Sequence, residues 1–184
     1  MSFLIGRGDP PGRPGRGTAS PLQTNYQSRF TGFMRRFILF LSSNAGLGYS
    51  PVAPGTVGTL AGIPAFWMLA SLPPLLYALT WLGLLFLSFW AAGEAGKIYG
   101  VVDDGRIVID ELVGYLATVA FLPFSWTAAI AGFFLFRFFD ITKIPPARWF
   151  DRQLKNGYGV VLDDVVAGVY GAIALRLLLW AVEY

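Results

Sequence analysis

The sequence predicts an all-α, polytopic helical integral membrane protein with about four to five apolar segments and an interfacial N-terminal helix. Of its 184 residues, 55% are hydrophobic and only 14% are charged, whereas about a quarter of the residues in a soluble domain are charged. The run 75–92 contains no charged residue. At about 1.5 Å per residue it is long enough to cross a hydrocarbon core of about 30 Å.

The N-terminal part differs in composition from the rest. Residues 1–28 are rich in Gly, Pro and Arg and lack an apolar core of signal-peptide length. We therefore expect a disordered tail over 1–28, followed by a single membrane-embedded domain over 29–184. Between residues 30 and 41, aromatic and aliphatic side chains surround Arg35 and Arg36. This pattern is typical of a short helix that lies in the membrane interface.

The remaining apolar segments predict two hairpins and a final span. Their ranges are 57–72 with 75–92, 107–122 with 126–139, and finally 165–182. Prolines at 73–74 and 123 mark the two hairpin turns. The sequence leaves open whether 107–122 spans the bilayer or re-enters. Arg176 interrupts the last span, and we expect its long side chain to snorkel toward the nearer, C-terminal interface.

Basic residues indicate the orientation. The turns at 73–74 and 123–125 carry no charge, and the loops at the opposite face carry Lys97, Arg106, Lys143, Arg148, Arg152 and Lys155. The positive-inside rule makes that second face cytosolic. Residues 42–58, 93–111 and 137–164 are therefore expected to meet at the cytosolic surface.

Composition excludes several kinds of chemistry. The chain contains neither cysteine nor histidine, so thiolate nucleophiles, structural zinc sites, histidine bases and phosphohistidine intermediates are absent. No basic stripe with interleaved aromatics stands outside the apolar segments, so we expect no nucleic acid partner. Any reaction must use carboxylates, Lys, Arg, hydroxyls, backbone amides or a metal held by oxygen ligands.

Carboxylates cluster near one face. Of 11 acidic residues, all but Asp9 and Glu183 lie between residues 94 and 164, and carboxylates at membrane depth usually face a cavity, a cation or a partner. Asp163 and Asp164 precede the last span, where helix capping is an alternative explanation.

Asp140 is flanked at three-residue spacing by Arg137 and Lys143, where salt bridges are the structural alternative. The same three side chains suit a site in which cations bind a phosphate while the carboxylate holds magnesium or attacks phosphorus.

Three blocks resemble the phosphatidylglycerophosphatase A family. They are APGTVGTL at 53–60, IVIDELVG at 107–114, and a third that joins FRFFDITK at 136–143, RWFD at 148–151 and GYGVVLDDVVAG at 157–168. The resemblance extends from about Gly46 to Gly171. The chain departs from the family pattern at Ile144 and Asn156, which affects loop geometry more than chemistry.

That resemblance implies a bacterial inner-membrane enzyme, with its active site facing the cytosol, that uses Mg²⁺ to hydrolyse phosphatidylglycerophosphate to phosphatidylglycerol and phosphate. The expected metal ligands are Asp110, Asp140, Asp163 and Asp164. The expected catalytic residues are Asp140, Glu111 and Lys143, and the expected substrate-binding residues are Arg137, Lys143, Arg152 and Thr56. An attacking water and an aspartyl phosphoenzyme both remain open, and the absence of paired aspartates at 140–143 favours water.

Three alternatives belong to other functional classes. A small cation transporter predicts carboxylates near mid-bilayer in both halves, whereas these cluster at one face beside basic residues. A membrane scaffold predicts tolerance to loss of single carboxylates. A lipid phosphotransferase predicts a spaced aspartate signature and a nucleotide loop that the sequence lacks.

Overall fold

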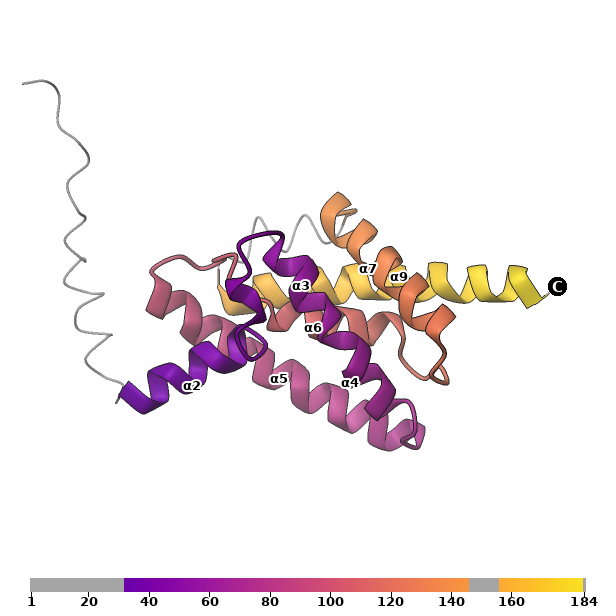
Figure 1. The fold of residues 1–184 in the computed structure, drawn as a ribbon, viewed down its shortest axis with the longest axis horizontal. Coiled ribbons are helices and arrows are strands. Elements are labelled where there is room, and N and C mark those ends of the chain that lie inside the picture. The colour runs from indigo at the N-terminus through magenta and orange to yellow at the C-terminus, as the bar shows by residue number, and fades with distance from the viewer. Residues whose placement is uncertain (1–31, 146–155, 184) are drawn as a thin grey trace, which may run out of the picture.

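The computed structural model describes residues 32–145 and 156–183, and within these ranges the regular structure is entirely helical (Figure 1). The elements are α2 (Gly32–Ser42), the short 3-10 helix η1 (Leu47–Tyr49), α3 (Pro54–Leu60), α4 (Gly62–Leu69), α5 (Pro74–Tyr99), α6 (Ile109–Thr118), α7 (Trp126–Thr142) and α9 (Gly157–Glu183). The predicted tail over 1–28 and the basic residues Arg148, Arg152 and Lys155 lie outside the described residues.

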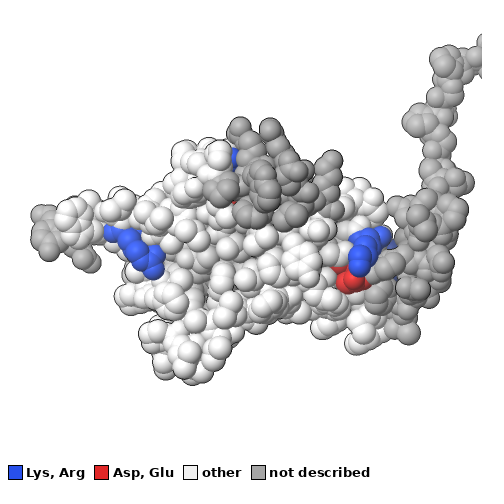
Figure 2. Space-filling model, turned by 180° about the vertical axis from the view of Figure 1, so that it is seen from behind, with Lys and Arg blue, Asp and Glu red and all other residues white. Residues whose placement is uncertain are grey.

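Two of these helices are long and apolar enough to cross a membrane: Pro74–Tyr99 and Gly157–Val182. The first confirms the helix expected over 75–92. Most of their side chains are not buried inside the protein, and Figure 2 shows a surface that is almost free of charge, with visible charged groups mainly toward the two ends. An uncharged apolar surface is typical of helices that face lipid.

The other apolar segments form shorter helices. The segment 57–72 divides at Ala61 into α3 and α4, and α6 has ten residues, about 15 Å of helix, which covers only half of a hydrocarbon core. The loops at 70–73 and 119–125 lie toward the side of the C-terminus, and the starts of α3 and α9 lie toward the other side (Figure 1). Four to five spans and an interfacial α2 remain predictions.

Helix α9 begins eight residues earlier than the expected span at 165. Asn156 caps it, because its Oδ1 accepts hydrogen bonds from the backbone N–H groups of Tyr158 and Gly159 at 3.1 and 3.2 Å. Asp163 and Asp164 therefore lie nearly two turns inside α9. The capping explanation for these two carboxylates is wrong, and they need another account.

Helix α6 occupies the centre of the fold. A Cβ on Gly168 of α9 would collide with the backbone oxygen of Gly114, so the two helices cross in direct backbone contact. Thr118 Oγ1 lies 3.2 Å from the Gly168 oxygen, to which it donates a hydrogen bond. On the other side of α6, Tyr77 and Trp81 of α5 donate to its backbone carbonyls at 2.8 and 3.0 Å. These contacts hold the second half of α6 between α5 and α9.

Arg176 supports the far end of α6. Its Nη2 donates to the Ala120 oxygen at 2.6 Å, and its Nη1 donates to the Ala172 oxygen at 3.0 Å. The guanidinium is thus bound to the loop that joins α6 to α7, where the last carbonyls of a helix otherwise lack donors.

Candidate active site

A polar cavity of about 360 Å³ opens where α3, α6, α7 and α9 approach one another. Its charged lining residues are Asp103, Asp110, Glu111, Arg137, Asp140, Lys143, Asp163 and Asp164. Seven of these eight were singled out from the sequence, and the structure brings them together from α6, the end of α7, and α9. Their individual roles stay predictions.

The first turn of α6 contributes two buried carboxylates. Asp110 is 6% exposed, and neither Asp110 Oδ1 nor Glu111 Oε2 accepts a hydrogen bond. Burial raises the pKa of Asp110, and the nearby carboxylates of Glu111 and Asp163 raise it further. Burial also raises the pKa of Glu111 to about 8, although Arg137 opposes the shift. Both oxygens therefore face a cavity that is short of positive charge.

Helix α7 contributes Arg137 and Asp140, which lie one turn apart. Arg137 Nη1 lies 2.5 Å from Asp140 Oδ2 and 3.5 Å from Glu111 Oε1. These distances define ion pairs, yet the buried Nε and Nη1 groups form no aligned hydrogen bond. We regard the contacts as electrostatic, because hydrogen bonds require alignment as well as proximity. The N–H donors of the guanidinium remain available to an anion.

Lys143 follows α7 directly and turns the chain with a φ of 45°. Its Nζ lies 2.8 Å from Asp163 Oδ2. The structural alternative of salt bridges is thus confirmed for Arg137 with Asp140, whereas Lys143 pairs with a carboxylate from another helix. Each cation of the cavity is held next to a carboxylate that was predicted to bind metal.

Three positions differ from expectation. Asp103, in the loop between α5 and α6, lines the cavity but was not singled out, because no helical spacing links it to the other acids. Thr56 is half-buried on α3 and does not line the cavity, whereas Pro54 and Gly55 do. Arg152 lies outside the described residues.

The donor set fits a divalent cation in charge and chemistry. The cavity lining holds six acidic and two basic side chains, and hard cations such as Mg²⁺ prefer carboxylate oxygens. Within residues 32–145 and 156–183, however, no three acidic side chains converge in a metal-binding arrangement. Two of the four predicted ligands, Asp140 and Asp163, instead face Arg137 and Lys143. Metal binding would therefore require these ion pairs to open.

Comparison with known proteins gives consistent matches. Residues 40–179 match the family model described as phosphatidylglycerophosphatase A. The phosphatidylglycerophosphatase A of Escherichia coli K12 is 41% identical over 133 residues, 72% of this chain and 77% of the relative. The Haemophilus influenzae protein of the same name is 40% identical over 149 residues, 80% and 89% of the two chains.

A third relative has a different name. A Bacteroides thetaiotaomicron protein, provisionally named a phosphatidylinositol-3-phosphatase, is 36% identical over 152 residues, 78% of this chain and 94% of the relative. No solved structure matches the chain. Relatives of this chain are thus named for activity on different phospholipid headgroups.

Proposed function

Because the chain belongs to the phosphatidylglycerophosphatase A family, we propose that it is a magnesium-dependent phosphatase that hydrolyses phosphatidylglycerophosphate to phosphatidylglycerol and phosphate. The observation that carries this proposal is the gathering of Arg137, Lys143 and six carboxylates in one cavity. Cations that can hold a phosphate beside carboxylates that can hold a metal are what phosphoryl transfer requires.

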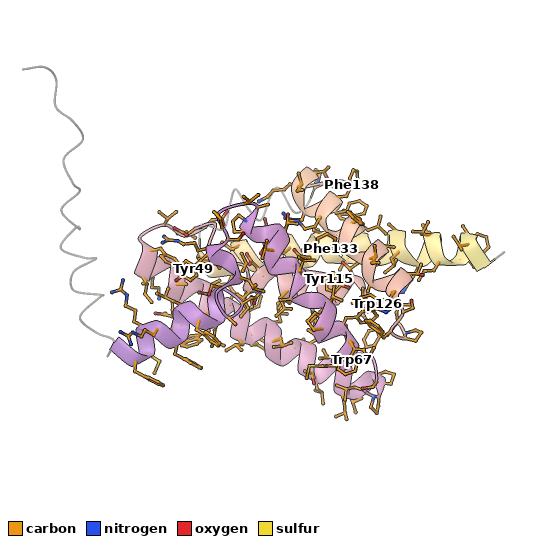
Figure 3. The ribbon with its side chains drawn as sticks, viewed as in Figure 1. Tyr49, Trp67, Tyr115, Trp126, Phe133 and Phe138 are labelled. Atoms are coloured by element: carbon orange, nitrogen blue, oxygen red, sulfur yellow. The ribbon has the colours of Figure 1, made fainter. Side chains whose placement is uncertain are left out.

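The proposed setting is the bacterial inner membrane, which the chain would cross several times with the cavity facing the cytosol. Two helices have the necessary length and apolar character. Trp67 and Trp126 lie toward one end of the molecule and Tyr49 toward the other (Figure 3), and amphipathic rings favour the two membrane interfaces. Helix α2 exposes 78% of Phe33 next to Arg35 and Arg36, which suits a helix lying in the cytosolic interface.

Substrate binding begins with an exchange of ion-pair partners. The terminal phosphate offers Arg137 and Lys143 a doubly charged partner in place of Asp140 and Asp163, and guanidinium and ammonium groups bind phosphate strongly. The two carboxylates then face the cavity together with Asp110 and Asp164. Arg152 and Thr56 are proposed to contact the rest of the headgroup, and the acyl chains stay in the bilayer.

Asp110, Asp140, Asp163 and Asp164 are proposed to hold Mg²⁺, which when bound would polarise the phosphate oxygens and lower the pKa of a bound water. Water attacks phosphorus and gives up a proton, the bond between phosphorus and the glycerol oxygen breaks, and the leaving oxygen takes up a proton, so that no proton is gained or lost overall. Glu111 is proposed to supply the proton to the leaving oxygen and to recover one from the attacking water, because burial raises its pKa to about 8 in the absence of metal. Arg137 and Lys143 balance the charge that develops on the phosphate.

The decisive experiment measures phosphate release by the purified protein in detergent micelles. Phosphatidylglycerophosphate, phosphatidic acid and phosphatidylinositol 3-phosphate are compared with Mg²⁺ and with a chelator. We expect Mg²⁺-dependent release from the first lipid alone. Release from phosphatidylinositol 3-phosphate alone would overturn the substrate assignment. No release from any lipid by folded protein would overturn the phosphatase proposal and favour a cation transporter or a scaffold.

A further inference from the structure

A second hollow, larger than the polar cavity, lies between the cytosolic half of α5 and the first turn of α9. It measures about 760 Å³, and its apolar lining includes Phe86, Phe89, Trp90, Val102 and Tyr158. We call it the α5–α9 groove. None of the described residues that line it has a proposed role in catalysis, metal binding or phosphate binding.

The groove exists because two glycines bring the helices together. A Cβ on Gly157 would lie 2.5 Å from the backbone nitrogen of Gly93, so the backbones of α9 and α5 are in direct contact there. Both glycines line the groove. Neither glycine carries a side chain, and aromatic side chains of α5 and α9 line the groove beside this crossing. Phe89 and Tyr158 meet with their ring centroids 4.9 Å apart.

The groove and the polar cavity are lined by residues that are close in sequence at two places. In the loop after α5, Val102 lines the groove and the next residue, Asp103, lines the cavity. In α9, Tyr158 lines the groove, and Val160, two residues further on, lines the cavity. Because side chains two residues apart in a helix point to nearly opposite faces, α9 lies between the two hollows, which are therefore about one helix diameter, roughly 10 Å, apart. A phospholipid is long enough to span that distance.

We propose that the α5–α9 groove binds an acyl chain of the phospholipid whose terminal phosphate occupies the polar cavity. This inference rests on the proposed function and adds a site for the lipid part of the substrate. From Phe86 to Lys97 the groove follows α5 for about 17 Å. That direction is the direction of a membrane-spanning helix, and hence also that of a lipid tail.

The charges at the groove favour an uncharged occupant. Its charged lining residues among the described ones are Glu94 and Lys97, which form an ion pair of 2.7 Å near the cytosolic end of α5. The Glu94 side chain is 15% exposed, and its Oε2 is buried without a hydrogen bond. A buried carboxylate repels a phosphate, whereas the aromatic walls gain free energy by covering a hydrocarbon chain.

A matched pair of substitutions tests the groove. Phe86 of α5 lines it and is 67% exposed, and Phe134 of α7 is 66% exposed but lines neither hollow. We expect Phe86→Ala to raise KM for long-chain phosphatidylglycerophosphate about fivefold in mixed micelles, with kcat nearly unchanged. The same variant should leave KM for a water-soluble dibutanoyl analogue unchanged, and Phe134→Ala should change neither. Equal effects of the two variants, or an equal effect on both substrates, would overturn the proposal.

Photocrosslinking tests the site without turnover. The Asp140→Asn variant is incubated with phosphatidylglycerophosphate that carries a photoactivatable group on its acyl chain, and the labelled peptides are identified. We expect labelling concentrated in 86–102 and 156–158 and reduced by Phe86→Ala. Labelling spread evenly over α7 as well would mean that the groove holds only bulk lipid, which overturns the inference. Groove labelling without phosphate release by wild-type protein would instead overturn the proposed function and leave the acyl-chain site standing.

Discussion

Lys143 Nζ lies 2.8 Å from Asp163 Oδ2, so an ion pair joins the residue that ends α7 to the second turn of α9. Twenty positions separate the two residues in the chain. The Asp163 side chain is only 8% exposed, and a carboxylate this deeply buried needs a positive partner. The pair gives this buried carboxylate a positive partner, and under the proposed function it is a contact that the substrate phosphate would replace.

Lys143→Met tests that replacement. We expect phosphate release to fall on the order of 100-fold, because one cation that balances the developing charge is lost. Thermal stability should fall as well, since the buried carboxylate of Asp163 loses its partner. The double variant with Asp163→Asn should regain stability but not activity. Recovery of activity in the double variant would show that the pair serves the fold alone.

Asp140→Asn tests the carboxylate nearest to Arg137. The amide keeps the shape of the side chain but binds metal and balances the guanidinium far less well. We expect turnover to fall at least about 1,000-fold while the protein still inserts and keeps its helical circular dichroism spectrum. Asp104→Asn is the control, because Asp104 pairs with Arg106 at 2.6 Å and does not line the cavity. Comparable losses in both variants would contradict a specific role for Asp140.

Glu111 makes stability depend on pH when no metal is present. Its pKa of about 8 in the folded protein exceeds the ordinary value of 4.5. Below 4.5 both states hold the proton. As pH rises toward 8, the unfolded chain releases the proton and the folded protein keeps it. The free energy of unfolding should therefore fall by up to about 1.4 kcal/mol per pH unit across this window.

The measurement is Tm in chelator at pH 5, 6.5 and 8, for wild type and for Glu111→Gln. The variant should show a weaker decline with pH. Added Mg²⁺ should raise the wild-type Tm more at pH 8 than at pH 6.5, because metal binding favours ionised carboxylates. Parallel pH curves for both proteins would refute the assigned protonation of Glu111.

The long apolar helices of the fold could be predicted from the sequence, whereas the points at which the helices contact one another could not. The uncharged run 75–92 predicted the core of α5 because hydropathy over eighteen residues is a strong signal. The sequence predicts the last span only from residue 165, because Asp163 and Asp164 interrupt the apolar pattern before it, whereas α9 begins at Gly157. In the structure the acids face a polar cavity within the protein, so the helix continues through them.

Most residues of the candidate site could be predicted from the sequence, because regular spacing along a helix places them together. Arg137 and Asp140 share a helix, and one-turn spacing predicts their contact. Asp103 reaches the cavity from a loop, where sequence carries no periodicity to read. The pairing of Lys143 with Asp163 depends on the close packing of α7 against α9, where a Cβ on Gly171 would lie 3.5 Å from the Cα of Phe136. That packing is a tertiary property, and a single sequence does not show which glycines touch.

Gly58→Ala tests whether helix α3 positions Glu111. A Cβ at Gly58 would lie 2.9 Å from Glu111 Oε2 and 2.5 Å from the Cβ of Val108. Because the Cβ of Val108 cannot move without its backbone, α3 must shift away and release the Glu111 side chain. We expect kcat to fall on the order of tenfold together with Tm.

Gly83→Ala is the control, since Gly83 faces open space on α5. There alanine should stabilise the helix by about 0.5–1 kcal/mol without changing kcat. Full activity in Gly58→Ala would show that α3 does not hold Glu111 in place.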